Sequence, residues 1–417
     1  MTRQQLTVGI ASFIGMTVSA PALLSTTPLL LEPTSHEFGW GRATISMALL
    51  IASPLTALSY ILIGRLLDLF GARRILIPGY VLCGGSMMLM SQLNGSITQL
   101  IVLQVFSMLC GTLVTGIAFG NIISRYFSTN RGTLLGLCLG AGGGLGMTVM
   151  PLIGAALLEH GGWRTTYFGV GLIGLLLGLP AALALPRHRP PATAEAPTNV
   201  AVAEGLEGKV AIFKPAYLLM LGATCLTCMV INGIGGHMAA IMTDHGMTHT
   251  MAAAALSVYA GSMMAAQFGI GMLLDKLQTR RIIIPVFGIV LCGVVALQFS
   301  TSTAGLFLGA AMIGAGAGSE YSILPYFLTR LFGVRAFGLL YGTIYAIAAV
   351  GTGIGPFAMG KAFDITGSYS TALTAFEAAL LISIVLMLFL SPYRYAANGK
   401  PLEDESIDDR LLAKASA

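Results

Sequence analysis

The chain has 417 residues, of which 55% are hydrophobic and only 9% are charged, and its formal net charge is +5. Soluble domains carry roughly 25% charged residues, so the composition excludes an ordinary soluble protein and indicates a membrane protein. No segment alternates basic and aromatic residues, so nucleic acid is not an expected partner.

Long apolar stretches predict transmembrane helices, because a helix needs roughly 20 apolar residues to cross a hydrocarbon core about 30 Å thick. Continuous apolar runs disfavour a membrane barrel, whose strands alternate apolar and polar residues. The twelve predicted spans are residues 6–30, 44–63, 75–92, 96–122, 132–158, 166–185, 216–236, 251–270, 282–299, 303–327, 337–360 and 372–390. The first is expected to be an uncleaved helix, because apolar sequence continues through Leu31 beyond a signal-peptide length.

The distribution of Lys and Arg predicts that both termini are cytoplasmic. With the N-terminus inside, 19 of the 22 Lys and Arg residues fall in inner segments, and only Arg42, Arg164 and Lys361 fall outside. Positive charges accumulate on the cytoplasmic side of membrane proteins. The expected protein is therefore a multi-pass protein of a bacterial inner (plasma) membrane, whose net charge reflects topology and contact with anionic lipids of the bilayer.

The two halves of the chain repeat one pattern. Residues 64–74 read GRLLDLFGARR and residues 271–281 read GMLLDKLQTRR, which places Asp68 and Asp275 207 positions apart. Pro151 and Pro356 are 205 positions apart in two glycine-rich stretches. Such repeats are common in secondary transporters. The predicted organisation is a six-helix half at 1–186, a Pro- and Ala-rich cytoplasmic linker at 187–212, a second six-helix half at 213–392 and a cytoplasmic tail at 393–417.

The motif at 64–74 resembles the loop signature between helices 2 and 3 of the major facilitator superfamily, and 271–281 resembles its second-half echo. The resemblance implies an all-α membrane fold of two six-helix pseudo-repeats that works by alternating access. The segments RGTLLGLCLGAGGGLG, GGWR, RLFGVRAFGLLYG and KAFDITGSY resemble the branch of monocarboxylate transporters and oxalate:formate antiporters. Members of that branch commonly hold the anion with a basic residue in helix 8, yet residues 251–270 contain no Lys or Arg.

The resemblance also implies a conformational gate, in which Asp68 ties the halves together at the inner side, close to the start of the eleventh span. A helix N-terminus stabilises a carboxylate by roughly 0.3 to 1 kcal/mol when exposed. The alternative is that Asp68 and Asp275 only balance the arginines that set the topology. The echo has Gln278 where the first copy has Gly71, so its turn is less well supported. The expected gate residues are Gly64, Asp68, Gly71, Arg73, Arg74, Arg125, Asp275, Arg280 and Arg281.

Polar side chains inside the spans are costly and are therefore candidates for function. Glu320 is the candidate for proton coupling, since a buried carboxyl group readily holds a proton; a structural pairing with Arg125 or Arg330 is the alternative. The candidates for substrate binding are Tyr60, Thr115, Asn121, His237, Gln267, Tyr321, Tyr341, Tyr345 and Lys361, although each alone is more often a packing contact.

Four of the residues near the predicted outer ends have further expected roles. Lys361 is expected to neutralise Asp364 or Glu377, with direct contact to substrate as the alternative. His237 is expected to snorkel or to form a hydrogen bond, with a proton or anion role as the alternative. Trp40 and Trp163 are expected to anchor the chain at the membrane interface.

The predicted function is secondary transport of a small organic anion, monocarboxylate-like, by symport or antiport with a proton or a counter-solute. The alternative is export of amphipathic drug-like compounds. Cys225-x-x-Cys228 has the spacing of a redox or metal site, but inside a predicted membrane helix with no neighbouring His or Asp these side chains are expected to pack. No nucleotide-binding signature and no cluster of His, Asp or Ser is present, so neither an enzyme nor a cofactor is expected. The protein is expected to be monomeric.

Replacing Asp68 with Asn should shift the population toward the inward-open state and impair transport without preventing membrane insertion. The reason is that the amide removes the charge that the start of the eleventh span would stabilise. Uptake and membrane levels of the variant would be measured together, and normal uptake by a well-expressed variant would contradict the gate.

Overall fold

The computed structural model describes residues 3–126, 134–186, 206–277, 280–333 and 336–395. Within these ranges the chain is helical and forms no strand. The side chains of a few further residues inside helices lie outside the description, among them those of Asp68, Arg125, Asp275, Arg280 and Tyr321. Residues 187–205 of the predicted linker and 396–417 of the predicted tail also fall outside it, whereas residues 206–212 of the linker are described and include a short helix.

All twelve predicted spans fall on helices, which confirms the all-α prediction. The first half contains α1 (Arg3–Thr17), α2 (Ala20–Leu24), α3 (Thr27–Phe38), α4 (Arg42–Phe70), α5 (Ala72–Met90), α6 (Ile97–Gly111), η1 (Thr112–Val114), α7 (Gly116–Tyr126), η2 (Gly136–Gly142), α9 (Gly143–Ile173), η3 (Gly174–Gly178) and α10 (Leu179–Ala184). The second half contains α11 (Gly208–Ala211), α12 (Pro215–Asp244), α13 (His249–Leu277), η4 (Arg280–Ile282), α14 (Ile283–Phe299), α15 (Thr303–Phe332), α16 (Phe337–Thr366) and α17 (Ser370–Leu388).

Length and hydropathy alone identify eight helical stretches of the described chain as candidate membrane spans. One of them, Gly136–Ala184, is 49 residues long and contains both the fifth and the sixth predicted span. Gly162 divides it with φ of 72° and ψ of −177°, a backbone conformation outside the helical region. The shorter apolar helix α14 adds a stretch of 17 residues. The number of membrane spans therefore depends on identifying the turns inside long helical stretches, because one stretch can contain two spans.

Local residues explain several helix boundaries. Gly71 joins α4 to α5 with φ of 79°, the left-handed conformation that a turn-forming glycine supplies and that other residues rarely adopt. Ser96 caps α6 by accepting a hydrogen bond from the backbone N–H of Gln99, and Ser302 caps α15 in the same way through Gly305. The turn expected at Gly71 is thus present.

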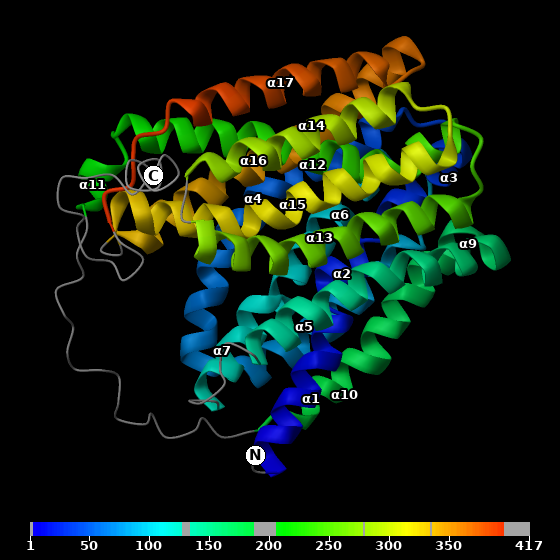
Figure 1. Ribbon diagram of the computed structural model, residues 1–417. Coiled ribbons are helices and arrows are strands. Elements are labelled where there is room, and N and C mark those ends of the chain that lie inside the picture. The colour runs from blue at the N-terminus through cyan, green and yellow to red at the C-terminus, as the bar shows by residue number, and fades with distance from the viewer. Residues whose placement is uncertain (1–2, 127–133, 187–205, 278–279, 334–335, 396–417) are drawn as a thin grey trace. The chain divides into compact units, whose positions relative to one another are not determined.

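The described chain divides into two compact units. Unit 1 contains residues 1–195, 233–261 and 356–369, so it includes one end of α12, α13 and α16 together with the first-half helices. Within it, α5 packs against α6 and α9, and α4 packs against α6 (Figure 1). The buried Tyr80 hydroxyl on α5 donates a hydrogen bond of 2.6 Å to the carbonyl oxygen of Gly15 on α1. This bond ties α1 to α5 inside the unit.

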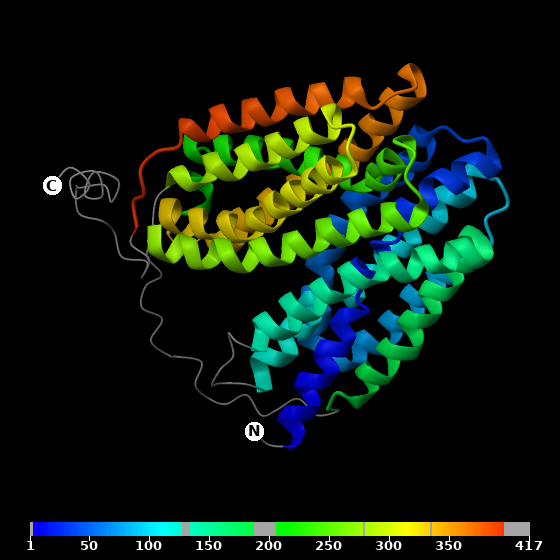
Figure 2. The same ribbon diagram turned by 45° about the vertical axis from the view of Figure 1, so that its right-hand side comes forward.

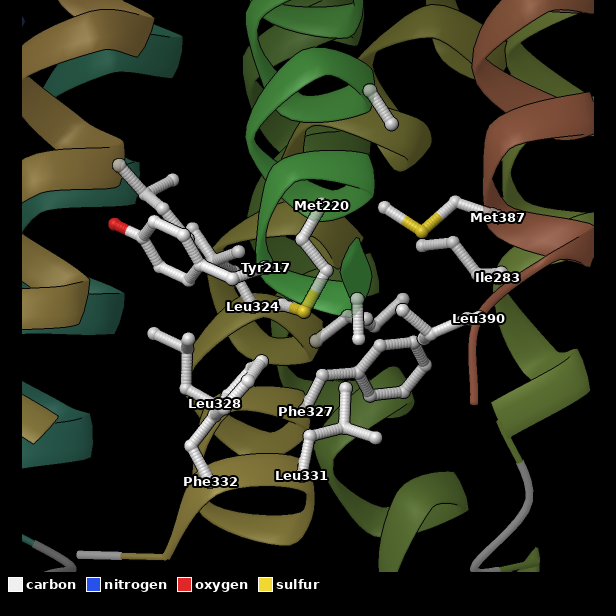
Figure 3. Close-up of a cluster of buried hydrophobic side chains, with 14 of the residues drawn as sticks. Tyr217, Met220, Ile283, Leu324, Phe327, Leu328, Leu331, Phe332, Met387 and Leu390 are labelled. Atoms are coloured by element: carbon white, nitrogen blue, oxygen red, sulfur yellow. The ribbon is translucent and has the colours of Figure 1, made fainter. Parts of the chain in front are cut away.

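Unit 2 contains residues 196–232, 262–355 and 370–417. In it, α14 packs against both α15 and α17, and the three helices run side by side in Figures 1 and 2. Figure 3 shows the hydrophobic cluster of this unit, in which Met220 of α12, Phe327 of α15 and Met387 of α17 meet. The Tyr217 hydroxyl donates a hydrogen bond of 3.1 Å to the carbonyl oxygen of Leu340, so the start of α12 is tied to α16.

The expectation that both tryptophans are interfacial anchors is wrong. Trp40 is 9% exposed and Trp163 is 4% exposed. Both rings contact Phe38, with ring centroids 4.6 Å and 5.7 Å from it respectively, and the Trp163 indole N–H donates a hydrogen bond to Glu37. The two indole rings are buried because they pack in an aromatic cluster inside unit 1, a pairing that their sequence positions did not indicate.

Gly318 should be intolerant of any side chain. A Cβ atom there would lie 1.9 Å from the carbonyl oxygen of Met263 on α13, whereas a Cβ at Gly288 on α14 would have no neighbour within 4 Å. Gly318→Ala must therefore separate two helices and should cost about 1 to 3 kcal/mol, as overpacking does. The matched variant Gly288→Ala should be nearly neutral. The midpoint of thermal unfolding of the purified protein measures both, and equal midpoints would contradict the close contact.

Candidate functional site

Most of the predicted inner gate lies outside the described side chains. This holds for Gly64, Asp68, Arg125, Asp275 and Arg280. In the described part of the motif, Arg73 donates a hydrogen bond to the carbonyl oxygen of Leu185 just after α10, and Arg74 is exposed, as is Arg281 in the echo. The inner gate therefore remains a prediction.

The candidate substrate-binding residues fall into both units. Tyr60, Thr115, Asn121, His237 and Lys361 belong to unit 1, and Gln267, Tyr341 and Tyr345 belong to unit 2; the side chain of Tyr321 is not described. The Tyr341 ring stacks on Phe337 at 5.2 Å and contacts the Tyr345 ring at 4.6 Å. Thr115 is buried and donates to the carbonyl oxygen of Thr112 in the preceding turn. The Thr115 hydroxyl therefore bonds to the backbone three residues earlier, whereas the rings of Phe337, Tyr341 and Tyr345 follow one another along α16.

Glu320 lies on α15 in unit 2, where the Cys228 thiol of α12 approaches it. The Sγ atom of Cys228 lies 3.7 Å from Oε1 of Glu320, within the range of a hydrogen bond from sulfur. Cys225 and Cys228 are both free thiols, so the Cys-x-x-Cys spacing forms no disulfide. A thiol supplies no positive charge, so this contact does not neutralise a carboxylate at Glu320.

The densest polar network in the described chain is centred on Arg42, the first residue of α4. Its guanidinium binds the Asp244 carboxylate at the end of α12 in a bidentate pair, with Nη1–Oδ2 at 2.7 Å and Nη2–Oδ1 at 2.9 Å. Arg42 is only 7% exposed. We call this network the Arg42 cluster, and all of its members belong to unit 1: Arg42, Ser46, His237, Asp244, Phe363, Asp364 and Tyr369.

Two aromatic residues complete the surroundings of the guanidinium. Its carbon atom lies 3.7 Å from the centroid of the Phe363 ring and 5.3 Å from that of the Tyr369 ring. Arg42 Nη1 also donates a hydrogen bond of 2.6 Å to the Tyr369 hydroxyl. The ring faces attract the cation and shield the Arg42 side of the ion pair from water, whereas the Asp244 side chain keeps contact with solvent.

Asp364 of α16 caps the start of α4. Its Oδ1 accepts the backbone N–H of Arg42 at 2.8 Å, and its Oδ2 accepts that of Ala43 at 2.9 Å. These N–H groups have no partner within their own helix, and the helix dipole favours a carboxylate there. A Cβ atom at Gly41 would lie 2.4 Å from Asp364 Oδ2, and one at Gly360 would lie 2.6 Å from the Ala43 nitrogen. The two glycines therefore permit this contact.

His237 lies at the centre of the cluster and is fully buried. Its Nδ1 lies 2.8 Å from the Tyr369 hydroxyl, and its Nε2 lies 2.9 Å from the Pro356 carbonyl oxygen and 3.0 Å from the Ser46 Oγ. The expected hydrogen bonding is therefore present, whereas snorkelling is wrong because the ring does not reach solvent. One side chain thus contacts α4, α16 and the segment that follows α16.

The expected pairing of Lys361 is also wrong. Asp364 uses both oxygens on the backbone of α4, and Lys361 forms no ion pair with Asp364 or Glu377 in the described part of the chain. Sequence reasoning missed Arg42, Asp244, Asp364 and Tyr369 as a group. The available signals were that Arg42 is one of three predicted outer cations and that KAFDITGSY, which contains Asp364 and Tyr369, is a segment shared with a known branch.

The long apolar helices of the described chain define a multi-pass membrane protein, and comparison with known proteins assigns its family. The family model of the Major Facilitator Superfamily matches residues 6–304 and 220–415. The chain therefore belongs to the major facilitator superfamily, as its loop motif indicated.

Similar proteins cover most of the chain. An uncharacterized MFS-type transporter of Bacillus subtilis (strain 168), YcxA, is 24% identical over 81% of this chain and 83% of its own. Monocarboxylate transporter 2 of Homo sapiens is 23% identical over 90% of this chain and 82% of its own.

Two solved structures share the fold. A bacterial homolog of the human lysosomal transporter Spinster, in an inward-facing and unoccupied conformation, has a TM-score of 0.70 at 16% identity and covers 94% of this chain and 95% of its own. The nucleoside transporter NupG has a TM-score of 0.73 at 13% identity and covers 93% of this chain and all of its own.

A double-mutant cycle should show strong coupling between Arg42 and Asp244. Asp244→Asn leaves the buried Arg42 guanidinium without its countercharge, whereas Arg42→Gln leaves the more exposed Asp244 carboxylate unpaired; both should lower the midpoint of thermal unfolding. The double variant should be no less stable than the worse single variant, with a coupling free energy of about 0.5 to 3 kcal/mol. Strictly additive losses would show that the pair contributes nothing beyond its separate side chains.

Proposed function

We propose that this transporter carries a small monocarboxylate-like anion together with a proton by alternating access. The observation that carries the proposal is the similarity to monocarboxylate transporter 2, which extends over 90% of this chain. The four segments that resemble the same branch support it independently, because they lie in both halves of the sequence.

Binding of an anion requires a positively charged side chain or several neutral hydrogen-bond donors. Residues 251–270 supply no Lys or Arg, and Arg42 is already neutralised by Asp244. Lys361 is exposed and forms no ion pair with the nearest carboxylates of its own half, so we assign it the attraction of the anion. The hydroxyl groups of Tyr341 and Tyr345 on α16 are proposed as donors to the carboxylate.

The proton is assigned to Glu320. A carboxylate at membrane depth is costly as an anion, and its contact with the Cys228 thiol does not neutralise it. Protonation removes that cost, so a proton bound at Glu320 stabilises the part of the cycle in which the group is away from water.

The two gates are proposed to act at opposite membrane faces. Both termini are cytoplasmic in this proposal, the membrane is a bacterial inner membrane and the protein acts as a monomer. The loop motif around Asp68 closes the inner side, and the Arg42 cluster closes the outer side. Alternating access requires that the cluster breaks when the cargo site faces outward.

Uptake into proteoliposomes tests the proposal. A panel of radiolabelled carboxylates, sugars and cationic drugs would be offered with and without an imposed pH gradient. Monocarboxylates should accumulate when the outside is acidic, and Glu320→Gln should abolish the effect of the gradient because an amide cannot take up the proton.

The control variant is Glu377→Gln, which removes a carboxylate from α17 and should leave the gradient dependence unchanged. Movement of cationic drugs without carboxylates would replace the anion proposal with export of amphipathic compounds. Carboxylate uptake that ignores the pH gradient with Glu320 intact would contradict proton coupling.

A further inference from the structure

A chain of hydrogen bonds runs through the Arg42 cluster, and we assign the tautomer of His237 from its partners that have only one possible role, with the Ser46 Oγ as a second neighbour of Nε2 at 3.0 Å. The Pro356 carbonyl oxygen can only accept, so the Nε2 atom of His237, 2.9 Å away, carries a hydrogen. Arg42 can only donate, so the Tyr369 hydroxyl oxygen accepts from it. The Tyr369 hydrogen is then available for its remaining neighbour, the Nδ1 atom of His237 at 2.8 Å.

These directions require a neutral imidazole. In the neutral ring with hydrogen on Nε2, Nδ1 is an acceptor and receives the Tyr369 hydrogen. Tyr369 lies between two spans, and burial raises the pKa of its phenol well above the usual value, so it keeps the hydrogen that it donates. The closed cluster is therefore complete only when His237 is uncharged.

A proton on Nδ1 disrupts this arrangement in two ways. Two hydrogens would then point at each other between Nδ1 and the Tyr369 oxygen, and the hydroxyl would have to rotate away from its acceptor. The imidazolium would also be separated from the Arg42 guanidinium by only one hydroxyl oxygen, since both contact Tyr369. Like charges at that spacing, away from water, repel strongly.

The other charged groups of the surrounding elements do not compensate this charge. On α12, Asp244 is held by Arg42, and His245 lies beyond it with its Nδ1 at 2.8 Å from the Ile241 carbonyl oxygen. On α16, Asp364 is held by the backbone N–H groups of α4, and Lys361 adds a further positive charge. In the described part of the chain, His237 contacts two hydroxyl groups and a carbonyl oxygen, not a carboxylate.

We propose that His237 is a proton-binding site that controls the outer gate: the neutral ring holds the Arg42 cluster closed, and protonation releases α12 and α16 from α4. This inference rests on the proposed proton-coupled function and deepens it. Acid on the outer side opens the cluster, so the pH gradient that supplies the proton for Glu320 also favours the state that receives the anion. By linkage, one proton changes the ratio of open to closed molecules by at most tenfold per pH unit.

The test measures access to the cluster without any substrate. Ser46→Cys places a thiol on a side chain that is 1% exposed in the closed cluster. The purified protein in lipid nanodiscs would be treated with a polar maleimide between about pH 7.5 and about pH 5.5, the range in which an ordinary His side chain titrates. The alkylation rate of this thiol would be divided by its rate in the unfolded chain at the same pH, and the parent chain without the reporter would be subtracted.

The normalised rate should rise about threefold or more toward acid in the reporter protein. His237→Gln keeps a donor for Pro356 but does not titrate, so the rise should disappear. The matched control is His245→Gln, which removes a histidine from the same helix end outside the cluster and should leave the rise intact. Tyr369→Phe removes the acceptor of Arg42 and the donor to His237, so it should give faster alkylation at neutral pH and a shallower rise.

A rise that persists in His237→Gln, or that is absent from the reporter protein, would overturn the proposal. If His237→Gln fails to give a folded protein, the Tyr369→Phe result decides alone, and an unchanged profile in that variant would overturn the proposal equally. The two proposals fail separately: a pH-dependent alkylation rate without carboxylate uptake removes the proposed cargo and leaves the gate, whereas proton-driven uptake with pH-independent alkylation removes the role of His237.

Discussion

The burial of one guanidinium governs the architecture of unit 1 at the start of α4. A charged group removed from water is tolerated only when a countercharge and hydrogen-bond acceptors surround it. Asp244, Tyr369 and Phe363 supply these to Arg42 from α12, from α16 and from the segment after α16. Three second-half helices have one end in the compact unit formed by the first half, and the Arg42 cluster contacts two of them, α12 and α16.

The start of α4 also depends on a second carboxylate, that of Asp364. The backbone N–H groups of Arg42 and Ala43 need acceptors, and Asp364 supplies both oxygens because Gly41 and Gly360 let the chains approach. The motif around Asp68 predicts the equivalent arrangement at the opposite face, with a carboxylate of the first half at a helix start of the second half. A carboxylate at a helix N-terminus would then hold each face closed in turn. Protonation of His237 would open the outer face.

The sequence predicted the helices far better than it predicted which side chains contact one another. Continuous apolar runs indicated the long helices, and the glycine at position 71 indicated the turn between α4 and α5, because both signals act over neighbouring residues; the short helix α11 lies in the segment predicted as a linker. The pairing of Lys361 with Asp364 was wrong because proximity along a helix cannot show that a backbone 322 positions away takes the carboxylate first. The burial of Trp163 was missed for the same reason, since Phe38 and Glu37 reach its ring from α3.

The sequence by itself therefore determined the class of protein: its composition requires a membrane, its repeat and loop motif require two related halves, and its family follows from both. The tertiary structure alone decided which polar residues act together. Hydropathy and helix propensity are local sums over adjacent residues, whereas the Arg42 cluster gathers side chains from positions 42 to 369 whose charges and hydrogen bonds are satisfied only by one another.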